Sequence, residues 1–86
     1  MLQHGHMTAT VTARINSRMR LRSDLPEPEQ RRSIREAVGI SQQELADIVG
    51  VSRQAVTAWE AGDRYPRKAQ LARYVEALTA LKAAAA

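Results

Sequence analysis

The chain has 86 residues, contains no cysteine and carries 13 Lys and Arg against 9 Asp and Glu, for a formal net charge of +4. This length allows one small helical core, and the basic charge favours a polyanionic partner, although many proteins are equally basic. The absence of Cys excludes disulfides and Cys-ligated zinc and, with no apolar run near the roughly 18 residues of a membrane span and no signal peptide pattern, predicts a cytoplasmic protein.

Residues 1–24 are interpreted as an N-terminal extension. Residues 1–7 look like a leader or cloning remnant, with Met7 a candidate natural start. His4 and His6 have no third ligand in this segment, so we expect no metal site. β-branched residues alternate along residues 8–15, which allows a short strand that would have to pair with a symmetry mate or remain disordered.

A basic segment ends the extension. It contains four arginines close together: Arg14, Arg18, Arg20 and Arg22. Two interpretations stay open, a solvated tail or an arm that contacts DNA phosphates or enters a minor groove.

Residues 25–86 are expected to form the folded domain. Pro26 and Pro28 are tolerated only outside a helix or in its first turn, so the first helix of the domain should begin between Pro26 and Glu29. It should run to Gly39. Its expected inward residues are Ile34, Ala37 and Val38.

Residues 41–62 predict two short helices joined by a tight turn. Ser41 and Glu44 have the S-x-x-E spacing of a capping box, which starts the first of these helices. Gly50 supplies the positive φ that ends it. The expected apolar stripe consists of Leu45, Ile48 and Val49.

The second helix of this pair should span residues 52–61 and end at Gly62. Ser52 can cap it, with Val56 and Trp59 facing inward and Ala55 packing closely. The side chains on the opposite face are then Arg53, Gln54, Thr57 and Ala58.

Five positions in this stretch share the spacing of a known motif: Gln42, Ala46, Gly50, Val56 and Trp59. With them, and with the E-x-G that follows, residues 29–80 resemble the phage repressor and Cro-like, or XRE, helix-turn-helix family. The resemblance implies an all-α fold, a compact four- or five-helix bundle of the lambda-repressor-like type, with residues 52–61 as the recognition helix. It also implies that Arg35 pairs with Glu60 and clamps the first helix to the motif.

A recognition helix places its outer residues in the major groove, where each base pair presents a distinct pattern of donors and acceptors. Arg53 can donate two hydrogen bonds to a guanine, and Gln54 can form two hydrogen bonds with an adenine. Thr57 and Ala58 are short enough to contact thymine methyl groups or to let the helix lie deep in the groove.

Other residues are expected to contact phosphates. They are Gln42, Ser52, Arg64, Tyr65, Arg67 and Lys68. For the last four, a plain solvated loop is the alternative. After Pro66, a final helix carries an apolar stripe of Leu71, Tyr74, Val75, Leu78 and Leu81, and its half from about Leu78 is expected to serve a dimer interface.

These features predict sequence-specific binding of double-stranded DNA and transcriptional regulation, most simply repression, by a homodimer on a palindromic operator. Two alternatives remain: an antitoxin whose N-terminal extension binds a toxin, and a protein-interaction module that binds another regulator. The sequence offers no Cys nucleophile, no His outside the leader and no Gly-rich phosphate loop, so we expect neither catalysis nor a cofactor.

Overall fold

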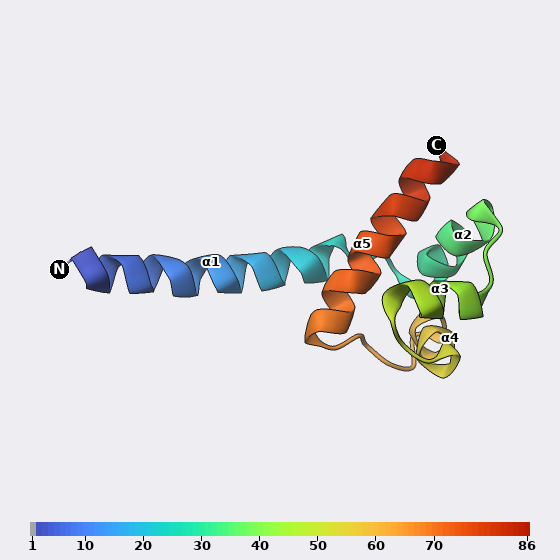
Figure 1. Ribbon diagram of the computed structural model, residues 1–86, viewed down its shortest axis with the longest axis horizontal. Helices are drawn as coiled ribbons and strands as arrows, with labels where there is room; N and C mark the ends of the chain where they lie inside the picture. Colours follow the sequence, from blue (N-terminus) through green and yellow to red (C-terminus); the bar gives the residue numbers. More distant parts are fainter. Residues whose placement is uncertain (1) are drawn as a thin grey trace.

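The computed structural model describes residues 2–86, and their side chains from Thr10 onward, as five α-helices with no strand in that part of the chain (Figure 1). Four helices form the bundle, and the first projects from it as a long rod that packs against the last. This arrangement confirms the predicted all-α class. The helices are α1 (Leu2–Asp24), α2 (Pro28–Val38), α3 (Gln42–Val49), α4 (Arg53–Ala61) and α5 (Lys68–Ala85).

The short strand considered for residues 8–15 is wrong, because the segment lies within α1. A lone strand leaves its backbone groups without partners, whereas a helix forms these hydrogen bonds within the segment. The alternating apolar residues therefore do not share one face. Val11, Ile15 and Met19 instead form an exposed row at helical spacing, with exposed fractions of 57%, 54% and 62%.

The core joins α5 to the helix-turn-helix pair. Trp59 of α4 and Tyr74 of α5 lie with ring centroids 4.6 Å apart and planes tilted by 41°. Leu25, just after α1, is also buried, and Leu21 packs against the same core, so α1 is anchored by its C-terminal end. The other core residues are Leu45, Ala46, Val49, Val56, Leu71, Val75, Ala77 and Leu78.

Two expected inward residues lie outside the core. Ile48 is 63% exposed. The side of α3 that faces the core carries Leu45 and Val49, and Ile48 lies about 100° around the helix from Val49. In α2, Ala37 is exposed, and the buried side chains on that helix are Arg31 and Arg35. The inward face of α2 therefore carries arginines as well as the half-buried Ile34 and Val38.

The expected dimer stripe on the last helix also needs correction. Leu78 is only 1% exposed and belongs to the core of its own chain. Leu81 is partly buried against that core as well. The stripe is used within the chain because α5 packs against α1, α2 and α3.

The turn of the motif follows the expected local chemistry. Ser41 and Glu44 form a complete capping box at the start of α3, with both hydrogen bonds 3.0 Å long. Gly50 ends the helix at φ +81°, a conformation that favours glycine. Arg73 of α5 donates to the Val49 carbonyl oxygen at 2.8 Å, which satisfies an end group of α3 and ties α5 to the turn.

Candidate nucleic-acid interface

The outer face of α4 is an exposed polar surface. Ser52 caps the helix by accepting a hydrogen bond from the Ala55 N–H at 3.2 Å. Because Val56 and Trp59 are 0% and 2% exposed, the opposite side of the helix faces solvent. The structure brings the four predicted base-contacting residues together on that side, with Arg53, Gln54 and Thr57 exposed and Ala58 half-buried.

Arg53 and Gln54 are available for a ligand. Among the residues with described side chains, neither makes a side-chain hydrogen bond or ion pair. A guanidinium offers five N–H donors, and an amide offers two donors and an acceptor oxygen. The start of α4 therefore presents both a donor fork and a donor-acceptor pair to solvent.

Thr57 is held by the neighbouring helix. Its hydroxyl oxygen lies 2.7 Å from Gln42 Oε1 and 3.0 Å from the Arg53 carbonyl oxygen, so it donates to one of them. The Gln42 amide in turn donates to Glu60 Oε1 at 3.1 Å. Gln42, expected to contact a phosphate, thus also links the first residue of α3 to the middle and the last turn of α4.

The Arg35–Glu60 ion pair that the resemblance implied is present and shielded. Arg35 donates through Nε at 2.6 Å and Nη2 at 2.9 Å to the two carboxylate oxygens, and the side chains are 10% and 3% exposed. Arg35 also donates to the Ile40 carbonyl oxygen at 2.9 Å. The hydrogen bond to Glu60 raises the pKa of Arg35 above its ordinary value, partly opposed by burial. This pair fixes α4 relative to α2.

A second buried arginine was missed from the sequence. Arg31 is 6% exposed and donates to the Trp59 carbonyl oxygen at 2.9 Å and to the Pro26 carbonyl oxygen at 2.7 Å. Its position one helical turn before Arg35 is the only sequence signal that could have placed it on the same face. Arg31 and Arg35 together hold the last turn of α4.

The loop between α4 and α5 collects several predicted phosphate-contacting residues. Arg64, Tyr65 and Arg67 line one hollow together with Ser52, beside the start of α4. Lys68 lines the cleft on the α1 side of the loop, which Arg67 also borders. The loop and the start of α4 therefore form one basic surface next to the exposed face of the helix. Gln42, at the start of α3, belongs to the hydrogen-bond network with Glu60 and Thr57.

A capped helix with a polar outer face, packed across a second helix through a glycine turn, defines a helix-turn-helix domain. The helix-turn-helix family model matches residues 32–79, and the chain belongs to this family of DNA-binding transcription regulators, of the XRE and Cro-like type. No curated protein and no solved structure matches the chain.

Two other kinds of site were sought in the described part of the chain. Within it, no helix is both long and apolar enough to cross a bilayer. No group of three or more His, Cys, Asp or Glu side chains is placed to hold a metal ion there. The side chains of His4 and His6 lie outside the described residues.

Proposed function

We propose that this protein binds a specific duplex DNA sequence by inserting α4 into the major groove and regulates transcription, most simply as a repressor that occludes a promoter. The observation that carries the proposal is the exposed, uncommitted pair of Arg53 and Gln54 on a helix whose opposite face is buried. Polar side chains without intramolecular partners are free to bond base edges without breaking an existing contact.

In this proposal, two residues read bases and two permit close approach. Arg53 donates two hydrogen bonds to guanine O6 and N7, and Gln54 pairs with adenine N6 and N7. The short side chains of Thr57 and Ala58 let the middle of the face approach the bases closely, and the Thr57 hydroxyl lies against Gln42. The buried Arg35–Glu60 pair keeps α4 rigid enough for such contacts.

Phosphate contacts position the helix without reading sequence. The basic loop supports this role, since its charged side chains are exposed beside α4. Gln42 stands at the positive end of α3, where backbone N–H groups attract phosphates. The proposed set is Gln42, Ser52, Arg64, Tyr65, Arg67 and Lys68.

We also propose a homodimer on a palindromic operator, with half-sites about 34 to 36 Å apart, because single helix-turn-helix domains gain affinity by pairing. The partner surface is not the stripe starting at Leu78, which is buried in the core. Sedimentation equilibrium with and without operator duplex tests the dimer. A complex containing one protein per palindrome at saturation would contradict it.

The experiment is selection from a pool of random duplexes at two salt concentrations, with wild type, Arg53→Ala and Gln54→Ala. We expect a palindromic site, and a loss of about 1 to 3 kcal/mol with relaxed preference at one base position for each variant. Arg32→Ala is the matched control, since Arg32 is an exposed arginine of α2 paired only with Glu36. It should keep the wild-type site.

Two results would contradict the proposal. One is a wild-type protein that selects no site and binds more weakly than about 10⁻⁶ M at physiological salt, the level of non-specific contact. The other is an Arg53→Ala variant with unchanged preference. Either result would direct the search to a protein partner.

A further inference from the structure

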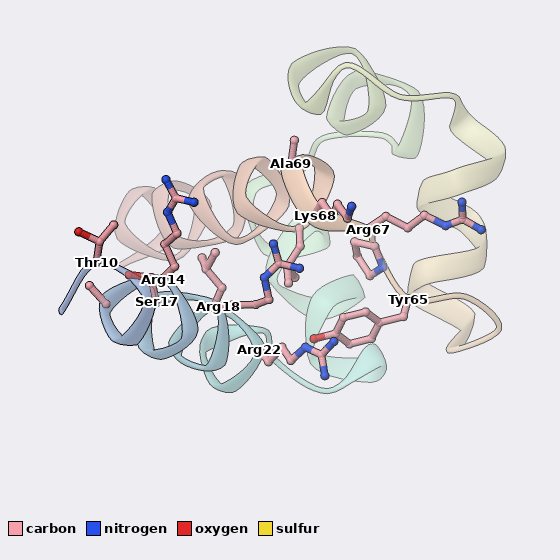
Figure 2. Close-up of a pocket in the computed structure, with 13 residues that line it drawn as sticks. Thr10, Arg14, Ser17, Arg18, Arg22, Tyr65, Arg67, Lys68 and Ala69 are labelled. Atoms are coloured by element: carbon pink, nitrogen blue, oxygen red, sulfur yellow. The ribbon is translucent and has the colours of Figure 1, made fainter. Parts of the chain in front are cut away.

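A basic cleft separates α1 from the first turn of α5 (Figure 2). It is open, with a volume of about 1060 Å³. One wall carries Arg14, Arg18 and Arg22 of α1, and the other carries Arg67 and Lys68. Figure 2 shows Arg14 and Arg18 directed from α1 toward α5, with Lys68 at the start of α5.

The positive charges of this cleft are not neutralised within the described residues. No Asp or Glu lines the cleft, and the ion pairs found in that part of the chain are formed by Arg32 and Arg35 elsewhere. Arg22 lies over the Tyr65 ring, 5.9 Å from its centroid, a contact that leaves its charge in place. Like charges held this close repel one another, so a polyanion in the cleft would be bound favourably.

The cleft continues the surface proposed to contact DNA. Tyr65 and Arg67 line it and also line the hollow beside Ser52 at the start of α4. A ligand that follows the basic side chains therefore passes from the recognition helix, across the loop, to α1 without meeting an acidic lining residue. This continuity favours a long polyanion over a small one.

The three cleft arginines of α1 form a regular row of positive charges. Arg14, Arg18 and Arg22 are four residues apart and share one face of the helix, so the row extends over about 12 Å at a rise of 1.5 Å per residue. Phosphates on one DNA strand advance about 3.4 Å along the duplex axis per nucleotide while the strand also turns around that axis, so successive phosphates lie farther apart than this rise. The row is long enough to contact more than one phosphate of a strand.

Lys68, on the opposite wall, has a strained backbone. Its φ is +33°, and it is the one non-glycine residue with positive φ in the described chain. Such conformations persist only where the surrounding structure over-determines them, and they occur often at ligand-binding sites. Lys68 lines the cleft opposite the arginine row.

We propose that this cleft binds the sugar-phosphate backbone of the duplex flanking the site read by α4, with α1 acting as a rigid helical arm. The inference rests on the proposed function, because it places α1 on the same DNA. It extends the contacted DNA beyond the bases under the recognition helix.

The test compares Arg18→Ala with Arg20→Ala in the full chain. Both remove one arginine from α1, but Arg20 does not line the cleft. Affinity for the selected duplex and for a random-sequence duplex is measured over a range of salt concentrations. We expect Arg18→Ala to reduce the slope of log K against log salt by about 0.9 on both duplexes, and Arg20→Ala to leave it unchanged.

The triple variant Arg14→Ala/Arg18→Ala/Arg22→Ala should lower the slope by about 2.7 and lose the gain in affinity that added flanking base pairs give the wild type. Alanine is a better helix former than arginine, so α1 should be retained, which far-UV circular dichroism checks. Equal slopes for wild type, Arg18→Ala and Arg20→Ala would overturn the inference, as would equal reductions in both variants. Failure of the proposed function itself would appear separately, as unchanged base preference in Arg53→Ala.

Discussion

Replacing Arg35 by methionine should lower the free energy of unfolding far more than the loss of one exposed charge would. Arg35 and Glu60 form two hydrogen bonds of 2.6 and 2.9 Å, with side chains 10% and 3% exposed. Arg35→Met would leave the Glu60 carboxylate buried with only the Gln42 amide as donor. Removing one partner of a buried pair costs about 3 to 5 kcal/mol. A chain of this length has a free energy of unfolding of roughly 4 to 13 kcal/mol, so the substitution should remove a substantial fraction of it.

Urea unfolding followed by far-UV circular dichroism measures this loss. The double variant Arg35→Met/Glu60→Met removes both charges, so it should lose much less than the sum of the single variants. Arg32→Ala is the control, because the Arg32–Glu36 pair has side chains 64% and 53% exposed and should contribute less than about 1 kcal/mol. A loss in Arg35→Met as small as that in Arg32→Ala would refute the reasoning, and additive single losses would show that the charges do not interact.

Three further predictions concern stability. The buried Tyr74 hydroxyl has no hydrogen-bond partner among the described side chains, so Tyr74→Phe should raise the free energy of unfolding by about 1 kcal/mol, measured by urea unfolding. Burial, with the nearby Glu60 carboxylate, raises the pKa of Tyr74 above its ordinary value of 10.0. As the pH rises, the Tyr74 hydroxyl therefore loses its proton first in the unfolded chain, and the free energy of unfolding of the wild type should fall by up to roughly 1.4 kcal/mol per pH unit above pH 10. Tyr74→Phe should lack this pH-dependent loss. Parallel curves of stability against pH for the two proteins would contradict the prediction. Ser52→Ala should cost about 1 kcal/mol through loss of the α4 cap, seen as a lower midpoint in the same titration, whereas no change would mean that the cap is not needed. Ile48→Gln should change the free energy of unfolding by less than about 0.5 kcal/mol, whereas Leu45→Ala should lower it by about 2 to 5 kcal/mol. Similar losses for the two variants in thermal melts would place Ile48 in the core.

The helix-turn-helix was predictable because its signals are local. The capping box of Ser41 and Glu44, the Ser52 cap and the Gly50 turn each depend on residues close in sequence, and all three appear in the structure. The base-contacting face followed from these boundaries, since helix geometry fixes which side chains oppose Val56 and Trp59. Whether those side chains contact DNA stays a prediction.

The errors arose where tertiary packing decides the outcome. Alternation over residues 8–15 suggested a strand, but the described part of the chain has no second strand to pair with, whereas a helix forms its backbone hydrogen bonds within the segment. Ile48 and Leu45 are equally apolar, and only the direction of neighbouring helices determines which is buried. Arg31 received no role from the sequence, because nothing near it in sequence reveals that the Trp59 carbonyl oxygen lies within hydrogen-bonding distance.

The position of Trp59 beside Tyr74 gives the protein an intrinsic fluorescent probe. Trp59 is the single tryptophan of the chain, it lies on the buried side of the recognition helix, and its ring is 4.6 Å from that of Tyr74. Energy absorbed by Tyr74 should therefore pass to Trp59, and the indole should emit at the short wavelengths typical of an apolar environment. Any event that loosens α4 from α5 would shift this emission to the red, so docking of the recognition helix can be followed by fluorescence without a label.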